Sequence, residues 1–299
     1  MTIRLEGIFA PVVTPFGVSG ALDRAGFERN LRTHMASGLA GAVVTGSTGE
    51  APLLDEQERD TLLEWSRPLI TGNRLLIAGI GAEATRATLD RAKRAADRGA
   101  DAALVVAPHY FGGAMTTDAL RKHYSALADA SPIPVIFYNI PKYMHFRLEP
   151  ALVRELAAHT NIIGIKDSSG DRALICEYLE ARGDRFTVLT GNAQILAYSL
   201  EQGARGGVLA VSLFAPDLTL ALVDAVARRD AAAAEALQAR LAPLGKVIVG
   251  EMGVPGVKAA LDAVGLAGGV PRSPLLPLSA ADAARVRQLL KDAELAVAA

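Results

Sequence analysis

Short apolar runs bounded by glycine, proline or polar residues recur along the chain as far as residue 211. Continuous apolar runs of this length are typical of parallel strands that are buried on both faces. The pattern therefore predicts eight such strands, at residues 7–13, 41–45, 75–79, 103–107, 135–138, 162–166, 186–190 and 207–211.

Amphipathic segments lie between these runs and predict helices, among them residues 22–37, 85–99, 117–130 and 148–159. The first helix should place its apolar side chains near one face: Leu22, Phe27, Leu31 and Met35. The second has a possible N-cap at Thr85 and a stop at Gly99. Eight strand–helix alternations favour a closed (β/α)8 TIM barrel over an open doubly wound sheet.

The pattern changes after the eighth strand, because residues 215–299 hold long Ala/Leu-rich helical stretches and no further strand signal. Residues 279–282 look like a capping box that opens the last helix. An irregular connector precedes it, marked by Pro271, Pro274 and Pro277. We therefore predict a catalytic barrel at residues 1–225 and a C-terminal helical appendage at residues 226–299.

Composition agrees with one large barrel, since the chain has 299 residues, of which 51% are hydrophobic and 21% charged. The net charge of −1 and the absence of a basic stripe with interleaved aromatics argue against a nucleic-acid partner. The single cysteine, Cys176, cannot form an intramolecular disulfide, which suits a reducing cytosol. Residues 1–6 lack the start of a signal peptide and no long apolar stretch predicts a membrane span, so we expect a cytoplasmic protein.

The sequence gives no sign of a metal or cofactor site. No two histidines have helix-face ligand spacing with a carboxylate partner, and none clusters with Cys176. No Gly-x-Gly-x-x-Gly follows a predicted strand, which argues against a dinucleotide. We therefore expect chemistry carried by side chains alone.

Two predicted strands end in residues that can do chemistry: Tyr138 and Lys166. Catalytic residues of such barrels sit at the carboxyl ends of strands, and successive strands lie about 4.8 Å apart. Burial disfavours the charged ammonium of a lysine, and a neutral lysine attacks ketones to form a Schiff base. A nearby tyrosine hydroxyl can shuttle protons. The alternative is that Lys166 caps its strand and points to water.

Other predicted strand ends offer polar groups. The second strand leads into residues 46–50, where Ser47 and Thr48 lie between two glycines and can bind a carboxylate or phosphate, although such a turn is also an ordinary βα loop. The remaining strand ends place these residues near the same edge: Tyr110, Ser168, Gly191, Asn192 and, in the last strand, Leu209.

Three segments resemble the dihydrodipicolinate synthase / N-acetylneuraminate lyase superfamily: Gly46-Ser47-Thr48-Gly49-Glu50, Tyr138-Asn139-Ile140-Pro141 and Gly164-Ile165-Lys166-Asp167. The resemblance extends over nearly the whole chain, including the helical C-terminal part. It implies a TIM-barrel class I lyase or aldolase that acts on pyruvate and an aldehyde without a cofactor. It also implies a homotetramer built as a dimer of dimers.

The resemblance also implies roles for individual residues. Lys166 matches the lysine that forms a Schiff base with the keto carbon of pyruvate or another 2-oxo acid, and Tyr138 matches the proton-shuttling tyrosine. Ser47 and Thr48 match the hydroxyls that hold the pyruvate carboxylate and relay protons. Tyr110 matches a tyrosine that enters a neighbouring subunit's site. The expected substrate site comprises Ser47, Thr48, Ser168, Gly191, Asn192, Leu209 and Tyr143.

One position departs from the resemblance. Dihydrodipicolinate synthases carry an arginine shortly after the Tyr-Asn-x-Pro motif, whereas this chain has Tyr143, and Arg147 is out of register. Residues 167–171 look more like 4-hydroxy-2-oxoglutarate aldolase. We therefore predict cleavage of a 4-hydroxy-2-oxo acid to pyruvate and an aldehyde, or the reverse condensation.

Three other functions stay open from the sequence. The first two use the same imine: 4-hydroxy-tetrahydrodipicolinate (dihydrodipicolinate) synthase, and a deoxy-sugar-acid dehydratase or aldolase. The third is a non-catalytic barrel that binds a small ligand. Retention of the lysine, tyrosine and hydroxyl set argues against the third, because binding alone needs no nucleophilic lysine.

Overall fold

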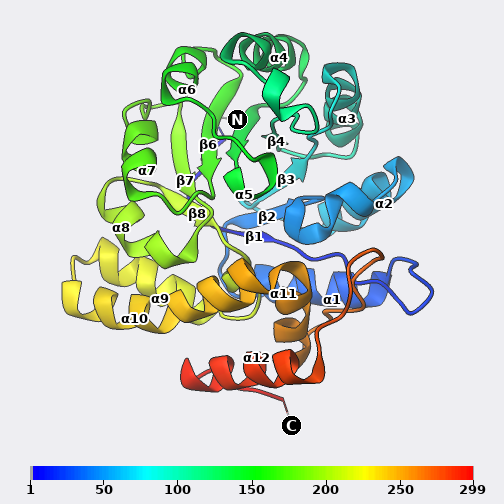
Figure 1. Ribbon diagram of the computed structural model, residues 1–299, viewed down its shortest axis with the longest axis vertical. Helices are drawn as coiled ribbons and strands as arrows, with labels where there is room; N and C mark the ends of the chain where they lie inside the picture. The colour runs from blue at the N-terminus through cyan, green and yellow to red at the C-terminus, as the bar shows by residue number, and fades with distance from the viewer. Residues whose placement is uncertain (1–2, 299) are drawn as a thin grey trace.

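The computed structural model describes residues 3–298, and a closed barrel of eight parallel strands lies at its centre (Figure 1). The strands are β1 (Gly7–Pro11), β2 (Gly41–Val44), β3 (Leu75–Gly79), β4 (Ala102–Val106), β5 (Val135–Asn139), β6 (Ile162–Asp167), β7 (Thr187–Thr190) and β8 (Gly206–Val208). Each strand pairs with the next along the chain, and β8 pairs with β1. The predicted TIM barrel is therefore confirmed.

The apolar runs form these strands because their side chains are buried on both faces; every residue of β2 and of β5 is buried. The prediction for the last strand was too long. β8 ends at Val208, because both the backbone N–H and the hydroxyl of Ser212 donate to the carbonyl of Leu209 and close a turn there. Leu209 thus lies at the end of the strand, where it can reach a ligand.

Helices cover the outside of the barrel (Figure 1). They are α1 (Arg24–Ala36), α2 (Glu56–Ser66), α3 (Thr85–Asp97), α4 (Thr117–Ala130), α6 (Pro150–Leu156), α7 (Arg172–Leu179), α8 (Leu196–Glu201) and α9 (Pro216–Ala227). The short α5 (Pro141–Met144) instead lies over the end of the barrel (Figure 1). The predicted apolar face of α1 is buried from Phe27 to Met35, while Leu22 precedes the helix. Thr85 was wrongly expected to be a cap: it is the first residue of α3, and its hydroxyl lies 2.9 Å from His123 Nδ1.

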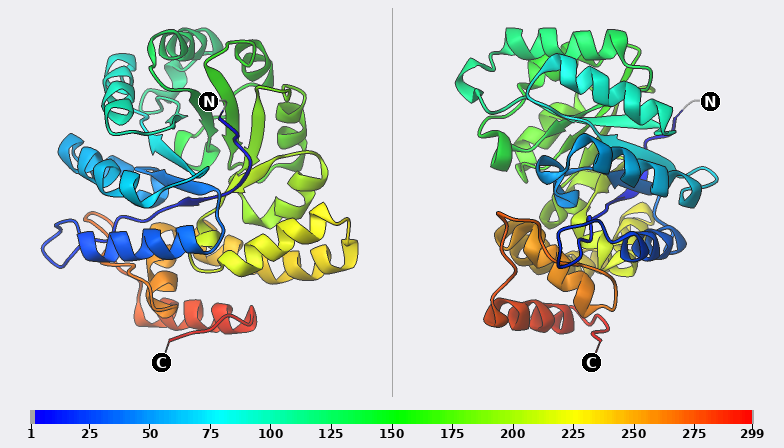
Figure 2. Two further views of the ribbon diagram at one scale, coloured as in Figure 1. Left: turned by 180° about the vertical axis from the view of Figure 1, so that it is seen from behind. Right: turned by 90° about the vertical axis from the view of Figure 1, so that its right-hand side faces the viewer.

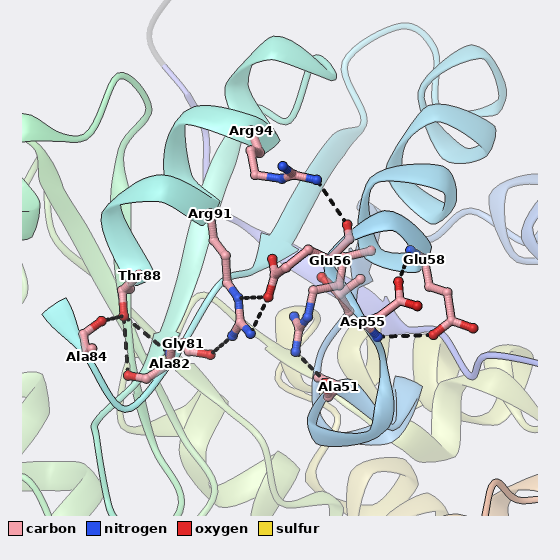
Figure 3. Close-up of polar contacts among 12 residues, drawn as sticks. Ala51, Asp55, Glu56, Glu58, Gly81, Ala82, Ala84, Thr88, Arg91 and Arg94 are labelled. Atoms are coloured by element: carbon pink, nitrogen blue, oxygen red, sulfur yellow. Dashed lines mark hydrogen bonds and ion pairs between the residues drawn. The ribbon is translucent and has the colours of Figure 1, made fainter. Parts of the chain in front are cut away.

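Charged side chains join α2 to α3 (Figure 3). Asp55 and Glu58 form a reciprocal capping box at the start of α2. Arg91 of α3 pairs with Glu56 of α2 at 2.6 Å and also donates to the carbonyl of Gly81. These contacts fix α2, which follows directly after the loop at the end of β2.

The C-terminal residues form α10 (Ala231–Pro243), a π-helical segment (Leu244–Glu251), α11 (Gly253–Ala263) and α12 (Ala280–Asp292). Figure 2 shows α11 and α12 extending from one side of the barrel. Ser279 caps α12 as predicted, although the Asp282 carboxylate accepts from the Ser279 hydroxyl and not from its N–H. The C-terminal helices share one hydrophobic core with the barrel. The domain boundary at residue 225 stays a prediction. No helix within residues 3–298 is long and apolar enough to cross a membrane.

We predict that buried His34 makes the fold sensitive to acid. Burial lowers the pKa of His34 to about 4, and neither ring nitrogen has a hydrogen-bond partner. Below the ordinary pKa of about 6.5, His34 is protonated in the unfolded chain but stays neutral in the folded chain. The free energy of unfolding therefore falls by up to about 1.4 kcal/mol for each pH unit that the pH is lowered. His34→Leu should therefore lose less stability than wild type between about pH 6.5 and pH 5 in urea titrations. Equal losses would contradict this.

Candidate active site

Lys166 and Tyr138 lie side by side at the carboxyl ends of neighbouring strands. The two residues are directly paired in the register of β5 and β6. The Lys166 ammonium lies 4.0 Å from the centre of the Tyr138 ring, and the two residues are only 6% and 5% exposed. A cation over an aromatic face is attracted electrostatically. The structure thus places the two side chains in contact, and Lys166 does not simply project into solvent.

A buried polar network holds the ends of these two strands. Asn139 donates to the Asp167 carboxylate at 2.7 Å and accepts from the Leu148 N–H at 2.9 Å. Asp167 also accepts from both the backbone N–H and the hydroxyl of Ser169. Because Asn139 and Asp167 directly follow Tyr138 and Lys166, the network fixes the backbone that carries both side chains.

Asp167 carries a buried carboxyl group with a shifted pKa at this edge. The residue is fully buried, and desolvation raises the pKa of its carboxyl group, against the opposing effect of hydrogen bonds from Asn139 and Ser169. A buried carboxylate needs such donors because burying an ionised carboxylate without them costs far more than burying a neutral polar group. Asp167 was not among the predicted site residues, and its place directly after the lysine is the signal that could have identified it.

Gly191 leaves the space that Lys166 occupies. A Cβ at this position would lie 1.9 Å from Ser168 Oγ and 2.8 Å from Lys166 Cε. The Gly191 N–H donates to the Asp167 carbonyl at 2.5 Å, which draws the end of β7 towards β6. A glycine is therefore required here by close approach of neighbouring side chains.

The turn after β2 presents Ser47 and Thr48 on a short 3₁₀ segment, Ser47–Gly49. The Thr14 hydroxyl donates to the Gly49 carbonyl at 2.7 Å. Glu50 follows in the left-handed conformation, with φ of 58°. The turn is thus a fixed structure with two hydroxyls on one side.

These elements enclose a cavity of about 250 Å³, of the size of a small metabolite. Nine of the ten predicted site residues line it: Ser47, Thr48, Tyr138, Tyr143, Lys166, Ser168, Gly191, Asn192 and Leu209. The structure brings these residues together, and it leaves their individual roles as predictions.

The tenth residue, Tyr110, lies outside the cavity. It is 78% exposed on the loop after β4 and packs edge-on against exposed Phe111, with ring centres 5.0 Å apart. The Glu83 carboxylate accepts from the backbone N–H groups of both His109 and Tyr110 and holds this loop in place. In a single chain Tyr110 does not contribute to the cavity.

Sequence reasoning missed one wall of the cavity, which comes from the C-terminal helices. The π-helical segment and α11 contribute Gly245, Val249, Gly250, Gly253, Val254 and Val257. The π-helix is rare and frequently marks functional sites. Gly245 was the sequence signal: a Cβ there would lie 3.0 Å from Ala193 Cβ, so the glycine lets the segment approach the loop after β7 closely.

Two residues after β5 face this wall. Lys142 lines the cavity, and its ammonium donates to the Gly250 carbonyl at 2.7 Å. Tyr143 also lines the cavity, and burial, with a smaller effect from Tyr138, raises the pKa of its phenol. Tyr143 therefore presents a neutral hydroxyl, and Lys142 is a cation within reach of an anionic group. The described residues contain no cluster of three potential metal ligands.

Comparisons with known proteins agree with this geometry. The profile of the Dihydrodipicolinate synthetase family matches residues 4–293. The 4-hydroxy-tetrahydrodipicolinate synthase of Exiguobacterium sp. is 36% identical over 281 residues, covering 94% of this chain and 95% of that protein. The chloride-inhibited dihydrodipicolinate synthase of Acinetobacter baumannii complexed with pyruvate has a TM-score of 0.92 and 30% identity, covering 98% of this chain and 100% of that one. A prophage protein of the dihydrodipicolinic acid synthase family from E. coli K12, in complex with pyruvate, has a TM-score of 0.91 and 28% identity, covering 98% and 99%.

We predict that Gly191→Ala impairs the reactivity of Lys166 more than it impairs stability. The new methyl group displaces Ser168 Oγ and Lys166 Cε, which are side-chain atoms that can move. Reductive trapping of pyruvate on the protein should slow by about tenfold or more, since small misplacements of reacting groups are costly. Gly183→Ala is the matched control, because a Cβ there meets nothing within 4 Å. Equal trapping rates in the two variants would contradict the prediction.

Proposed function

The chain belongs to the dihydrodipicolinate synthetase family and is a carbon–carbon lyase that works through a lysine–pyruvate imine, and we propose that Lys166 is that lysine. The observation that carries the proposal is the buried Lys166 ammonium, 4.0 Å from the Tyr138 ring at the mouth of a closed barrel. Both side chains line a cavity that holds a molecule of the size of pyruvate.

The proposed reaction begins with attack of Lys166 Nζ on C2 of a 2-oxo acid, with loss of water to give the imine. In the cleavage direction the protonated imine accepts the electrons of the breaking C3–C4 bond, while Tyr138 accepts the proton of the distal hydroxyl. The aldehyde leaves, the resulting enamine receives this proton at C3 from Tyr138, and hydrolysis of the imine then releases pyruvate and frees Lys166. In the synthetic direction the same groups add pyruvate to an aldehyde.

The turn at residues 47–49 is the proposed carboxylate site. Ser47 and Thr48, which carry its two hydroxyls, line the same cavity as Lys166. Hydrogen bonds to a charged acceptor are worth about 1.5–3 kcal/mol, enough to orient pyruvate so that its C2 faces the lysine. Ser168, Asn192 and Leu209 complete the proposed pyruvate site.

For the acceptor we propose an aldehyde with its own carboxylate, as in the synthesis of 4-hydroxy-tetrahydrodipicolinate from pyruvate and aspartate semialdehyde. The relatives named 4-hydroxy-tetrahydrodipicolinate synthase support this reaction better than cleavage of 4-hydroxy-2-oxoglutarate. Tyr143 replaces the arginine expected for such an acceptor, and we propose that Lys142 supplies the positive charge instead. Its ammonium already lies at the cavity wall, bonded to the Gly250 carbonyl.

A second candidate is the cleavage of a 4-hydroxy-2-oxo acid, and Tyr143 favours it. A phenol cannot make the bidentate, charge-assisted pair that arginine makes with a carboxylate.

Assembly and location form the last part of the proposal. The exposed Tyr110–Phe111 pair supports a homotetramer in which Tyr110 enters a neighbouring subunit's site, because large exposed aromatic side chains mark contact surfaces. The single Cys176 supports a reducing cytoplasm.

Pyruvate and borohydride should label the wild-type protein with one reduced pyruvyl group on the peptide that holds Lys166. Lys166→Ala should not be labelled, and labelling at the same stoichiometry would refute the assignment.

Tyr138→Phe should still be labelled, because it keeps the nucleophile, but its turnover should fall by about 10²–10⁴. Intact-mass measurements follow the labelling, and a coupled assay follows turnover.

Steady-state kinetics should give a higher kcat/KM for condensation with aspartate semialdehyde than for cleavage of 4-hydroxy-2-oxoglutarate. Lys142→Met should raise KM for the semialdehyde by about tenfold to a hundredfold and leave KM for pyruvate unchanged, since one charge-assisted bond is lost. Lys246→Met is the control, because Lys246 is an exposed lysine on the π-helical segment that also contains Gly250, and it does not line the cavity. The reverse order of kcat/KM values would favour the second candidate.

A further inference from the structure

A buried ion pair connects the C-terminal helices to the turn that holds the two hydroxyls. Lys258 of α11 lies with its Nζ 2.5 Å from Glu50 Oε1, and the side chains are 2% and 0% exposed. Glu50 directly follows the Ser47–Gly49 turn. We propose that Lys258 is a positioning residue, which acts through Glu50 to fix the hydroxyls of Ser47 and Thr48. This rests on the proposed carboxylate-binding role of the turn.

Residues of the C-terminal part contact both oxygens of the Glu50 carboxylate: Lys258 contacts Oε1, and the backbone N–H of Arg272 donates to Oε2 at 2.8 Å. Lys258 Nζ also donates to the Val270 carbonyl at 2.9 Å. Lys258 further lies over the Phe16 ring, at 4.7 Å. Charges so fully desolvated persist only when paired with good geometry. The pair therefore specifies one position for Glu50.

The backbone of Glu50 explains why this position matters for the turn. Its left-handed φ of 58° is unfavourable for a residue with a side chain. Its N–H donates to the Ser47 carbonyl at 3.1 Å, and its own carbonyl accepts from the Leu53 N–H at 2.8 Å. Contacts of the carboxylate hold the residue in this conformation, and the conformation closes the turn.

Neighbouring contacts on the turn show that it is held from several elements at once. Thr14, after β1, holds the Gly49 carbonyl, and Arg59 of α2 donates to the Ala51 carbonyl. Figure 3 shows Ala51 at the end of the loop before α2. The Lys258–Glu50 pair adds a contact at Glu50, which lies between Gly49 and Ala51 in the sequence. Neither the Lys258 nor the Glu50 side chain lines the cavity. Their effect on the substrate can therefore only be indirect.

Fixed hydroxyls matter because binding groups contribute fully only when their geometry is set before the ligand arrives. Loss of the pair lets Glu50 leave its strained conformation, and Ser47 and Thr48 then lose their fixed positions. Lys166 is held by a separate network around Asp167. The expected effect is weaker binding of pyruvate with little change in the chemistry of a bound molecule.

The test uses three variants of the full chain: Glu50→Gln, Lys258→Met and the double variant. Each single variant leaves a buried partner unpaired and can fail to fold, whereas the double variant removes both charges at similar volume. The readouts are thermal stability, KM for pyruvate and the rate of borohydride trapping at saturating pyruvate. We expect the double variant to raise KM for pyruvate by about tenfold and to keep its saturating trapping rate within about threefold.

Asp101→Asn is the control for general loosening. Asp101 pairs with Arg67 at 2.9 Å and accepts from the Leu76 N–H, just before β4 and away from the strand ends that form the site. This variant should lower thermal stability and leave KM for pyruvate unchanged.

The outcomes separate the inference from the proposed function. A wild-type protein that pyruvate and borohydride do not label contradicts the proposed function. A labelled wild type together with an unchanged KM in the double variant contradicts the positioning role alone. An equal rise of KM in Asp101→Asn, or a double variant that does not fold, shows that the pair serves stability only and overturns the inference.

Discussion

The pairing of β5 with β6 sets the geometry on which the site depends. Val135 pairs with Ile162, but Ile136 pairs with Gly164, so Ile163 is an extra residue in β6. This irregularity brings Lys166 level with Tyr138; without it Tyr138 would be level with Ile165. Because side chains alternate along a strand, a one-residue slip would turn the lysine away from its partner. The bulge therefore creates the lysine–tyrosine pair.

Glycines allow the strands to approach closely enough for this arrangement. A Cβ at Gly164 would lie 2.4 Å from the Thr187 carbonyl oxygen of β7, and a Cβ at Gly191 would collide with Ser168. The missing side chain at Gly191 thus leaves room for Lys166 at the strand ends. The Tyr138 ring, 4.0 Å from the ammonium, offsets part of the cost of burying it.

The barrel and the C-terminal helices contribute different parts of the cavity. The strand ends carry the reactive groups, which the closed barrel holds rigidly. The C-terminal helices add a wall with Val257 and a buried cation, Lys258, at adjacent positions of α11. In the proposed function, selectivity for the acceptor depends on the loop after β5 and on this wall, both of which can change without altering the barrel.

The sequence alone determined the eight strands, their parallel order and which polar residues stand at their ends, because buried apolar runs and the residues that follow them are local patterns. It also placed Lys166 and Tyr138 on neighbouring strands. Only the tertiary structure showed the bulge at Ile163, the end of β8 at Val208 and the true role of Thr85, since each depends on a partner elsewhere in the fold. For the same reason the sequence did not predict the C-terminal wall or the Glu50–Lys258 pair. Contacts between residues some two hundred positions apart produce no periodic pattern in the sequence, and only packing in the folded chain brings them together.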